Sequence, residues 1–407
     1  MRNADTSIRL AITGIGTICS IGRNRSEVWQ SIVESRAGIG KLTKFPGETF
    51  PTDVAAEVGD LDDVLPIDGR EARRMSRSDL LAVIAANEAI EQANEAATPL
   101  PRERAIVSTG TSTGGLLEGE SFYFDRLVRG RGRVEVSRVL QQPTSGPSDA
   151  VARALDLGGG VLSNATACAS AGAAIGMAAD LLRSRHADVA VAGGSDALCR
   201  LTYSGFNVLQ AVDEHPCSPF AADRKGITLG EGAAYLVIER WDDAVARGAT
   251  ILAELCGYGA TCDAHHPTAP HEEGRGAQAA MRGALADAHT EHVDYINAHG
   301  TGTLLNDSAE TKAIIAAVGE NVPVSSSKSY FGHTLGASGG VEAVISVLAL
   351  QNQVAPPTLR LDLAAADCTL DYIPHTPRPM AMTNVLSNTF GFGGSNVSIL
   401  FRRTQML

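Results

Sequence analysis

The chain has 407 residues, of which 44% are hydrophobic and 20% charged, and its formal net charge is −12. A chain of this length and composition buries a large core, which excludes extensive disorder and indicates two domains or one duplicated unit. The acidic balance argues against nucleic acid or a membrane surface as a general partner. The seven cysteines form no CxxC pair, and no apolar signal segment stands near the N-terminus, so we expect a reduced, cytoplasmic protein.

Short β-branched runs alternate with helical patterns along the whole chain, which is typical of mostly parallel sheets covered by helices. The first half predicts a strand at residues 9–15, a helix at 27–34 opened by Asn24, and a helix at 80–92 opened by Ser76 and Asp79. Also expected there are strands at 105–108, 189–192 and 234–239 and a helix of small residues at 169–182.

The second half repeats this alternation. Its expected strands are 251–258, 295–298, 322–325 and 397–401, and its expected helices are 278–288, 309–318 and 341–350. The boundary is expected near residues 247–250, which divides the chain into residues 1–248 and 249–407. Residues 117–144 and 263–276 have the composition of surface insertions on this scaffold.

Four stretches combine small residues with reactive or aromatic side chains, and each follows a predicted strand. They are residues 164–170 around Cys168, 297–303 around His299, 328–333 with Lys328 and His333, and 388–396 around Phe392. Cys168 stands at a helix start, where the helix dipole is expected to lower the pKa of the thiol and favour the nucleophilic thiolate. Considered alone, however, this cysteine is more often a small buried side chain.

His299 and His333 adjoin glycines at strand ends, where a ring can be directed into a shared cavity. Each histidine alone is more often structural. A zinc site formed with Cys168 is disfavoured because the sequence offers no local pair of ligands, so we expect no metal.

Two charged residues near these motifs have ordinary explanations as well. A solvated side chain is the commonest fate of a lysine such as Lys328. Glu310 has capping-box spacing from Asp307, which would explain it as part of a helix start.

Taken together, the four stretches resemble the elongating β-ketoacyl-acyl-carrier-protein synthases, the KAS I/II type of the thiolase superfamily, which act in fatty-acid and type II polyketide synthesis. The resemblance runs from about Ile8 to Arg403 and includes residues 193–196, 219–224, 229–232 and 263–265. It implies an α/β thiolase fold in which duplicated αβ halves form five αβαβα layers. It also implies a homodimer and no cofactor, because the substrates are carried on the phosphopantetheine of an acyl carrier protein.

The resemblance assigns the chemistry to three side chains. Cys168 would take the acyl group as a thioester, with the backbone N–H groups of Cys168 and Phe392 as the oxyanion hole. His299 and His333 would stabilise the enolate formed when malonyl-carrier protein loses carbon dioxide. The enolate carbon would then attack the thioester on Cys168 in a decarboxylative Claisen condensation.

Further roles follow from the same resemblance. Lys328 would orient the site, paired with Glu310 as in similar enzymes. Thr301 and Thr303 match the hydroxyls that hold the phosphopantetheine arm. Phe392 matches an aromatic gate in a glycine-rich loop.

Arg70, Arg73 and Arg74 resemble the family's docking patch for the acidic carrier protein, although a solvated helix face explains them equally well. The chain also departs from the family twice. Thr113 stands where relatives often place an aliphatic residue at the floor of the acyl pocket, which leaves the length and polarity of the acyl chain open. Residues 206–212 lack a basic residue that relatives use for docking.

Other members of the superfamily fit less well. A degradative thiolase needs a second cysteine near the C-terminus, where this chain has residues 390–394 without one. Starter-unit and chalcone-type enzymes use Cys, His and Asn, whereas the third position here is His333. A non-catalytic chain-length factor usually lacks the nucleophile, so Cys168 argues against it, but a partner subunit of that kind in a heterodimer remains the alternative function.

Overall fold

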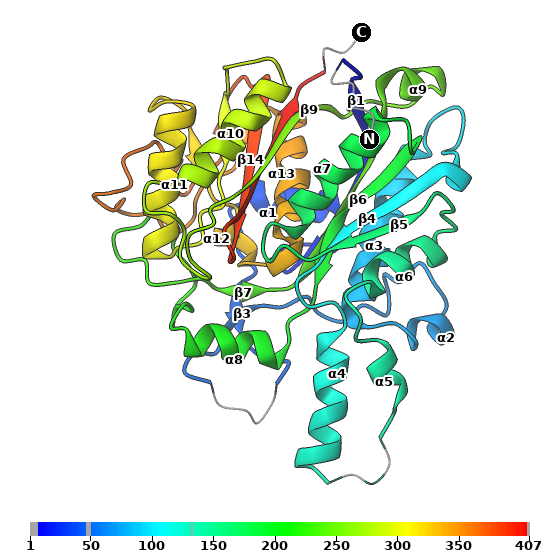
Figure 1. Ribbon diagram of the computed structural model, residues 1–407. Coiled ribbons are helices and arrows are strands. Elements are labelled where there is room, and N and C mark those ends of the chain that lie inside the picture. The colour runs from blue at the N-terminus through cyan, green and yellow to red at the C-terminus, as the bar shows by residue number, and fades with distance from the viewer. Residues whose placement is uncertain (1–6, 46–49, 131, 133, 405–407) are drawn as a thin grey trace.

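The computed structural model describes residues 7–45, 50–130, 132 and 134–404, and its main sheet has ten strands in the order β11-β10-β14-β15-β9-β1-β8-β6-β4-β5 (Figure 1). The strands of the N-terminal half are β1 (Leu10–Cys19), β4 (Ala105–Gly110), β5 (Val161–Asn164), β6 (Val189–Asp196) and β8 (Gly232–Arg240). Those of the C-terminal half are β9 (Ala253–Cys262), β10 (Tyr295–Asn297), β11 (Val324–Ser325), β14 (Asn384–Gly391) and β15 (Ser395–Arg402).

The two halves repeat one strand order. From its outer edge inward, each half runs through its third, second, fourth, fifth and first strand of the main sheet. In each half the second strand pairs in parallel with the third and the fourth, and the fourth pairs antiparallel with the fifth. The halves join where residues 10–12 of β1 pair antiparallel with residues 253–255 of β9. The expected duplication is therefore confirmed.

Helices cover both halves and separate them. On the N-terminal half, α3 (Arg77–Ala93) packs on β1 and β8, and α6 (Gly146–Ala154) packs beside it. On the C-terminal half, α10 (Arg275–Asp287) packs on β9 and β15, and α11 (Leu304–Ala317) packs beside it. Between the halves lie α7 (Ser170–Arg183) and α13 (Ser338–Asn352), which contact each other and strands of both halves (Figure 1). This is the expected five-layered αβαβα arrangement.

Local sequence signals account for several helix starts. At α3 the Ser76 hydroxyl accepts from the Asp79 N–H at 3.1 Å, while the Asp79 carboxylate accepts from the Ser76 N–H at 2.8 Å. Asn24 caps α1 (Arg25–Val33) by accepting from the Glu27 N–H at 2.9 Å. Both caps were expected from spacing alone, because each uses residues three positions apart.

The shorter elements lie around this core. They are α2 (Gly69–Ala72), α8 (Arg200–Val208), α9 (Trp241–Ala246), α12 (Lys328–Phe331), the pair β12 (Val354–Ala355) and β13 (Arg378–Pro379), and the small sheet of β2 (Gly40–Lys41), β3 (Val54–Ala56) and β7 (Leu229–Gly230). The segment expected as an insertion, residues 117–144, includes most of α4 (Leu116–Tyr123), a π-helical turn and α5 (Ser137–Leu140). Helices α4 and α5 project from the body (Figure 1). The predicted boundary between residues 248 and 249 falls between α9 and β9 and stays a prediction. No helix in the described ranges combines the length and apolar character needed to cross a bilayer.

Candidate active site

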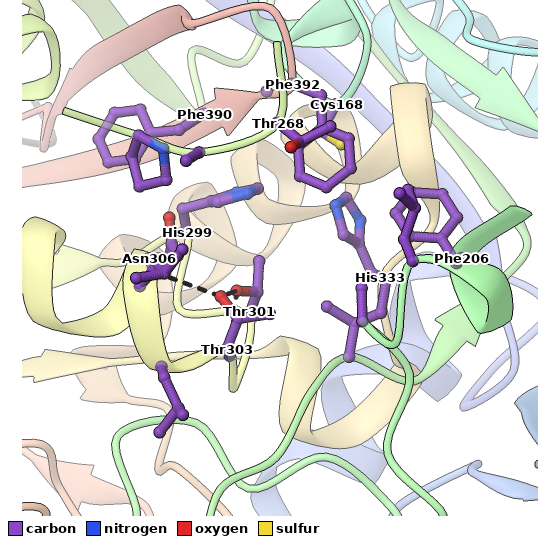
Figure 2. Close-up of a pocket in the computed structure, with 18 of the residues that line it drawn as sticks. Cys168, Phe206, Thr268, His299, Thr301, Thr303, Asn306, His333, Phe390 and Phe392 are labelled. Atoms are coloured by element: carbon purple, nitrogen blue, oxygen red, sulfur yellow. Dashed lines mark hydrogen bonds between the residues drawn. The ribbon is translucent and has the colours of Figure 1, made fainter. Parts of the chain in front are cut away.

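Three residues that are far apart in the sequence line one cavity. Cys168, His299 and His333 all face a cavity of about 310 Å³, together with Phe390 and Phe392 (Figure 2). Cys168 is 7% exposed and each histidine 3%, so all three side chains are largely shielded from bulk solvent. The expectation that the thiol and both imidazoles meet in one place is confirmed.

Cys168 lies in a strained turn between β5 and α7. Ala167 has φ 51°, a left-handed conformation that is costly for a residue with a side chain. Ser170 stabilises this turn, because its Oγ donates to the Ala167 carbonyl at 2.6 Å and accepts from the Thr166 N–H at 2.9 Å. On the other side, a Cβ at Gly391 would lie 3.1 Å from the backbone nitrogen of Cys168, so glycine allows the 391–394 turn to approach the thiol. Helix α7 begins two residues after the cysteine, close to the predicted position.

The protonation of the thiol differs from the sequence-based expectation. Burial raises the pKa of the Cys168 thiol to about 11, although the charge of Lys328 and the Phe392 backbone N–H both lower it. The expected lowering of this pKa is therefore wrong for the free protein, because removal of water from the sulfur outweighs the nearby positive charge. The resting side chain is a neutral thiol at neutral pH.

The hydrogen bonds of the two histidines fix their tautomers. Lys328 Nζ lies 3.2 Å from His299 Nδ1, and the Leu335 N–H donates to His333 Nδ1 at 3.2 Å. Since both partners are donors, each Nδ1 accepts and each Nε2 carries the proton. Burial, followed by the charge of Lys328, holds the pKa of both rings well below the ordinary value. The centroids of the two rings lie 5.4 Å apart, and the ring planes are nearly perpendicular. Because their pKa values are lowered, both rings are neutral N–H donors.

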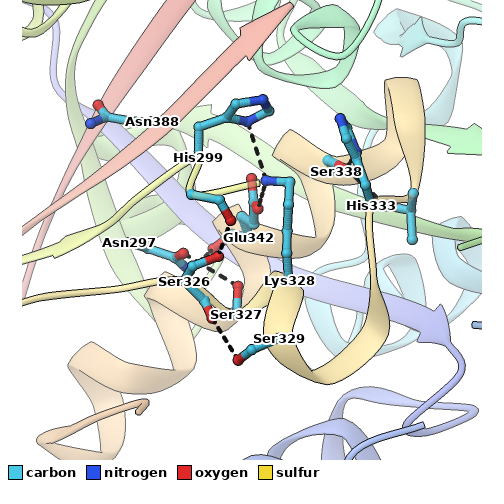
Figure 3. Close-up of polar contacts among 12 residues, drawn as sticks. Asn297, His299, Ser326, Ser327, Lys328, Ser329, His333, Ser338, Glu342 and Asn388 are labelled. Atoms are coloured by element: carbon cyan, nitrogen blue, oxygen red, sulfur yellow. Dashed lines mark hydrogen bonds and ion pairs between the residues drawn. The ribbon is translucent and has the colours of Figure 1, made fainter. Parts of the chain in front are cut away.

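Lys328 pairs with a different carboxylate from the one expected. Its Nζ forms an ion pair with Glu342 of α13, and both side chains are at most 1% exposed (Figure 3). The expected pair with Glu310 is wrong. Burial raises the pKa of Glu342 to about 7 in spite of the lysine beside it. The three groups Glu342, Lys328 and His299 form a continuous chain of polar contacts that ends at the cavity.

Glu310 supports the site through the backbone. Its two carboxylate oxygens accept from the His299 N–H at 2.8 Å and the Gly300 N–H at 2.7 Å. Asn388 Nδ2 also donates to it at 3.3 Å. Burial raises the pKa of Glu310 to about 7, and the backbone N–H groups of Gly300 and His299 oppose this rise. Glu310 thus holds the turn that presents His299.

The remaining predicted cavity residues occupy its wall. The hydroxyls of Thr301 and Thr303 lie 3.0 Å apart, and Thr303 also caps α11 by accepting from the Asn306 N–H at 3.3 Å (Figure 2). The ring of Phe392 packs 5.6 Å from that of Phe206 on α8 and is 37% exposed. Both threonines and Phe392 therefore line the same cavity as Cys168.

Other predicted site residues lie outside the lining of this cavity. Thr113 is buried, and its Oγ1 donates to Asp196 at 2.7 Å, so its polar atom is occupied by the protein. Arg70, Arg73 and Arg74 are exposed on and just after α2, away from α8 and α11 in the view of Figure 1. The 263–276 segment, by contrast, supplies part of the cavity wall through Asp263 and residues 268–270, so it is more than a surface insertion.

Sequence analysis missed Glu342 and Ser338. Ser338 Oγ lies 2.8 Å from His333 Nδ1, at the first residue of α13. Glu342 is the only ionisable residue between positions 338 and 352, within an otherwise apolar helix. A single carboxylate in such a helix indicates a buried partner, and this signal was available in the sequence.

Two family models match the chain, one for the N-terminal domain of beta-ketoacyl synthases at residues 8–244 and one for their C-terminal domain at residues 252–362. The chain belongs to the β-ketoacyl synthase family. The α/β thiolase fold and the acyltransferase class of enzyme expected from the sequence are therefore confirmed.

The matches to individual relatives cover nearly the whole length of this β-ketoacyl synthase. The chain is 39% identical to 3-oxoacyl-[acyl-carrier-protein] synthase 2 of Synechocystis sp. over 98% of both chains. It is also 39% identical to nodulation protein E of Rhizobium meliloti, over 97% of this chain and 99% of that protein. Among solved structures, the ishigamide ketosynthase/chain length factor superposes with a TM-score of 0.93 at 32% identity, over 98% of this chain and all of the other.

Proposed function

We propose that this β-ketoacyl synthase elongates acyl chains by condensing an acyl thioester with malonyl-acyl carrier protein, in fatty-acid or type II polyketide synthesis. The observation that supports this most strongly is the shared cavity of Cys168, His299 and His333, in which one thiol faces two neutral imidazole N–H donors. A nucleophile beside two such donors suits a reaction that forms a thioester and then develops negative charge on a carbonyl oxygen.

In the first half-reaction the Cys168 sulfur attacks the carbonyl carbon of the incoming acyl thioester. The backbone N–H groups of Cys168 and Phe392 stabilise the oxyanion of the tetrahedral intermediate. The bond between the carbonyl carbon and the carrier's sulfur then breaks, and the thiol proton of Cys168 passes to the leaving carrier thiolate. Because burial raises the pKa of the resting thiol to about 11, transfer of the proton from the Cys168 sulfur to the carrier sulfur accompanies the exchange of the two C–S bonds.

In the second half-reaction malonyl-carrier protein occupies the cavity. The bond between the malonyl carboxylate and the adjacent carbon breaks, carbon dioxide leaves, and the electron pair moves onto the thioester oxygen as an enolate. His299 and His333 donate their Nε2 protons in hydrogen bonds to that oxygen, where the charge develops. The enolate carbon then attacks the acyl-Cys168 carbonyl, and the sulfur leaves as a thiolate. A proton from water restores the thiol.

The surrounding residues hold these groups in position. Lys328, paired with Glu342, donates to His299 and keeps its ring in the required tautomer. Glu310 holds the backbone at His299. The hydroxyls of Thr301 and Thr303 contact the amides of the phosphopantetheine arm.

Phe392 and Thr113 complete the assignment on the acyl side. Phe392 swings on Gly393 and Gly394, whose φ values of 85° and 81° show a turn that glycine permits. Thr113 bounds the acyl pocket with its methyl group, since Asp196 occupies its hydroxyl. No cofactor is required beyond the phosphopantetheine of the carrier.

The partners we propose are an acyl carrier protein, docked in part on Arg70, Arg73 and Arg74, and a second ketosynthase-type subunit. Strand β5 is one of the two edge strands of the main sheet, and its Val161 is 43% exposed. An edge strand of this kind is suited to antiparallel pairing with another subunit. A homodimer is the simplest assembly. The chain has seven free cysteines, and cysteines that form no disulfide suit a cytoplasmic location.

A heterodimer with a chain-length factor is the alternative assembly, and this chain would then be either the catalytic subunit or its partner. The likeness to the ishigamide ketosynthase/chain length factor favours considering it. Cys168 and both histidines favour the catalytic role over the partner role.

The proposal is tested by incubating the purified protein with acyl-carrier proteins of different chain length. Intact-mass spectrometry reports the acyl group gained by the protein, and addition of malonyl-carrier protein should then release the 3-oxoacyl product. The acyl group that loads fastest identifies the preferred chain length. No mass gain from any donor, with the protein folded, would favour the partner role.

A further inference from the structure

The outer rim of the cavity carries exposed leucine side chains and one basic side chain. Leu209 of the loop after α8 and Leu304 and Leu305 of α11 line the cavity, and all three are more than half exposed. Lys225 lines the same rim and is exposed. No other lysine or arginine occurs among the residues described as lining the cavity. The mouth therefore presents a single positive charge on an apolar surface.

The backbone at Lys225 is fixed by its neighbours. Arg224 is buried, with its guanidinium 3.6 Å from Asp307 and 3.2 Å from Asp367. On the other side, the Ile227 N–H donates to the Ala211 carbonyl at 2.8 Å. Lys225 thus follows an arginine that faces inward and itself faces outward at a defined place. Within the described part of the chain, no hydrogen bond or ion pair occupies its ammonium group.

Lys225 also lies close in the chain to residues that pair with the 206–212 segment, in which the sequence departs from the family. Residues 206–212 hold no basic side chain, and Lys225 precedes the short segment that pairs with Ala211 and Val212. The one carboxylate of the lining, Asp263, accepts from Asn396 Nδ2 at 2.8 Å and from the His271 N–H at 3.2 Å. Because those donors occupy Asp263, the ammonium group of Lys225 is left available for an anion from outside.

We propose that Lys225 binds the phosphate of the phosphopantetheine arm and so positions the thioester in the cavity. This inference rests on the proposed function, in which such an arm must enter past the rim. The ammonium group of Lys225 can form a charge-assisted hydrogen bond to a phosphate oxygen at the rim. Lys225 acts as a positioning residue, since it lies at the outer end of the cavity, away from the reacting atoms.

The test compares two acyl donors that differ only in the phosphate, acyl-phosphopantetheine and acyl-pantetheine, with acyl-Cys168 formation followed by intact mass. Wild type should load the phosphorylated donor about tenfold more efficiently, the effect of one partly exposed charge-assisted bond. Lys225→Ala should lower loading from the phosphorylated donor alone and abolish the preference. Lys225→Arg should retain it. Lys41→Ala, at an exposed lysine on β2 that pairs with Asp53, is the matched control and should behave as wild type.

An acyl-carrier protein provides the second arm of the test, in which Lys225→Ala should raise KM with kcat little changed. A Lys225→Ala protein that keeps the wild-type preference for the phosphorylated donor would overturn the inference. An equal loss with both donors would overturn it as well, because a phosphate contact cannot affect a donor without phosphate. Wild type that accepts no acyl group from either donor or from any carrier would contradict the proposed function itself, and the inference would fall with it.

Discussion

The N-terminal half places Cys168 between its third strand, β5, and the central helix α7, whereas the C-terminal half places Lys328 and His333 between its third strand, β11, and the central helix α13. The strand orders are the same, and the chemistry differs. One half presents a thiol in a strained turn, and the other presents a cation and a neutral imidazole at equivalent places. His299, after the second strand of the C-terminal half, adds the second imidazole.

The comparison shows how a duplicated scaffold builds one site from two segments. Because α7 and α13 pack against each other, the turns that precede them meet at one cavity. The nucleophile and the donors that stabilise negative charge can then be substituted separately, because they belong to different segments. We therefore expect substitution of Cys168 and substitution of either histidine to affect different half-reactions.

The largest effect is expected from the donors of the C-terminal half. His333→Ala should reduce carbon dioxide release from malonyl-carrier protein about 100- to 1,000-fold, the typical loss for one oxyanion donor. Acyl loading on Cys168 should continue, as measured by intact mass. His292→Ala, at an exposed histidine, is the control. Equal loss of both half-reactions in His333→Ala would show that the two halves do not act separately.

The two halves should also differ in pH dependence. Reaction of Cys168 with iodoacetamide needs the thiolate, and a thiol whose pKa burial raises to about 11 gains thiolate about tenfold per pH unit up to that value. Alkylation measured in a Cys262→Ser background should therefore keep rising above pH 9. An alkylation rate that levels off near pH 9 would contradict the burial effect.

The imidazoles should behave in the opposite way. Burial holds the pKa of His299 and His333 well below the ordinary value of 6.5, so both rings stay neutral as the pH falls through 6.5. Any loss of carbon dioxide release by a Cys168→Gln protein should then follow the carboxyls of Glu310 and Glu342, whose pKa burial raises to about 7, and should level off near pH 6. A loss that continues at about tenfold per pH unit below pH 6 would mean that at least one ring titrates normally.

A smaller effect on activity is expected at the buried ion pair. Glu342→Gln should slow condensation by about tenfold or less, since Lys328 acts through His299 rather than on the substrate. Its larger effect is on stability: removal of one partner leaves a buried charge and should lower the free energy of unfolding by about 3 to 5 kcal/mol. Denaturant unfolding measures this loss.

A double variant separates the two effects of the ion pair. Lys328→Met combined with Glu342→Leu should recover much of the stability without the activity. The corrected pairing would be contradicted by a Glu342→Gln protein as stable as wild type.

Whether a feature of the fold or the site could be predicted from the sequence depends on how far apart the interacting residues lie along the chain. The caps at Asn24 and Ser76 use residues three positions apart, and both were predicted correctly. The meeting of Cys168 with His299 and His333 followed from the family resemblance rather than from spacing. The strand order of the halves required the structure, because pairing between distant strands leaves no periodic signal in the sequence.

The two corrections share a physical cause. The pKa of Cys168 was expected to fall because a helix start is a local feature, but the desolvation that raises it is imposed by the whole cavity wall. Lys328 was assigned to Glu310 by resemblance, yet its partner is Glu342, which the fold brings from α13. Burial and long-range pairing decided both outcomes.

The central claim is that one cavity brings together a nucleophile from the N-terminal half and two donors from the C-terminal half, and that these groups act in different half-reactions. The most direct measurement uses the Cys168→Gln protein with acyl-carrier and malonyl-carrier proteins, recording acyl mass gain and carbon dioxide release in parallel. We predict no acyl transfer at position 168 and continued release of carbon dioxide. Retained condensation would contradict the assignment of the nucleophile, and a loss of carbon dioxide release in a folded protein would contradict the independence of the two halves.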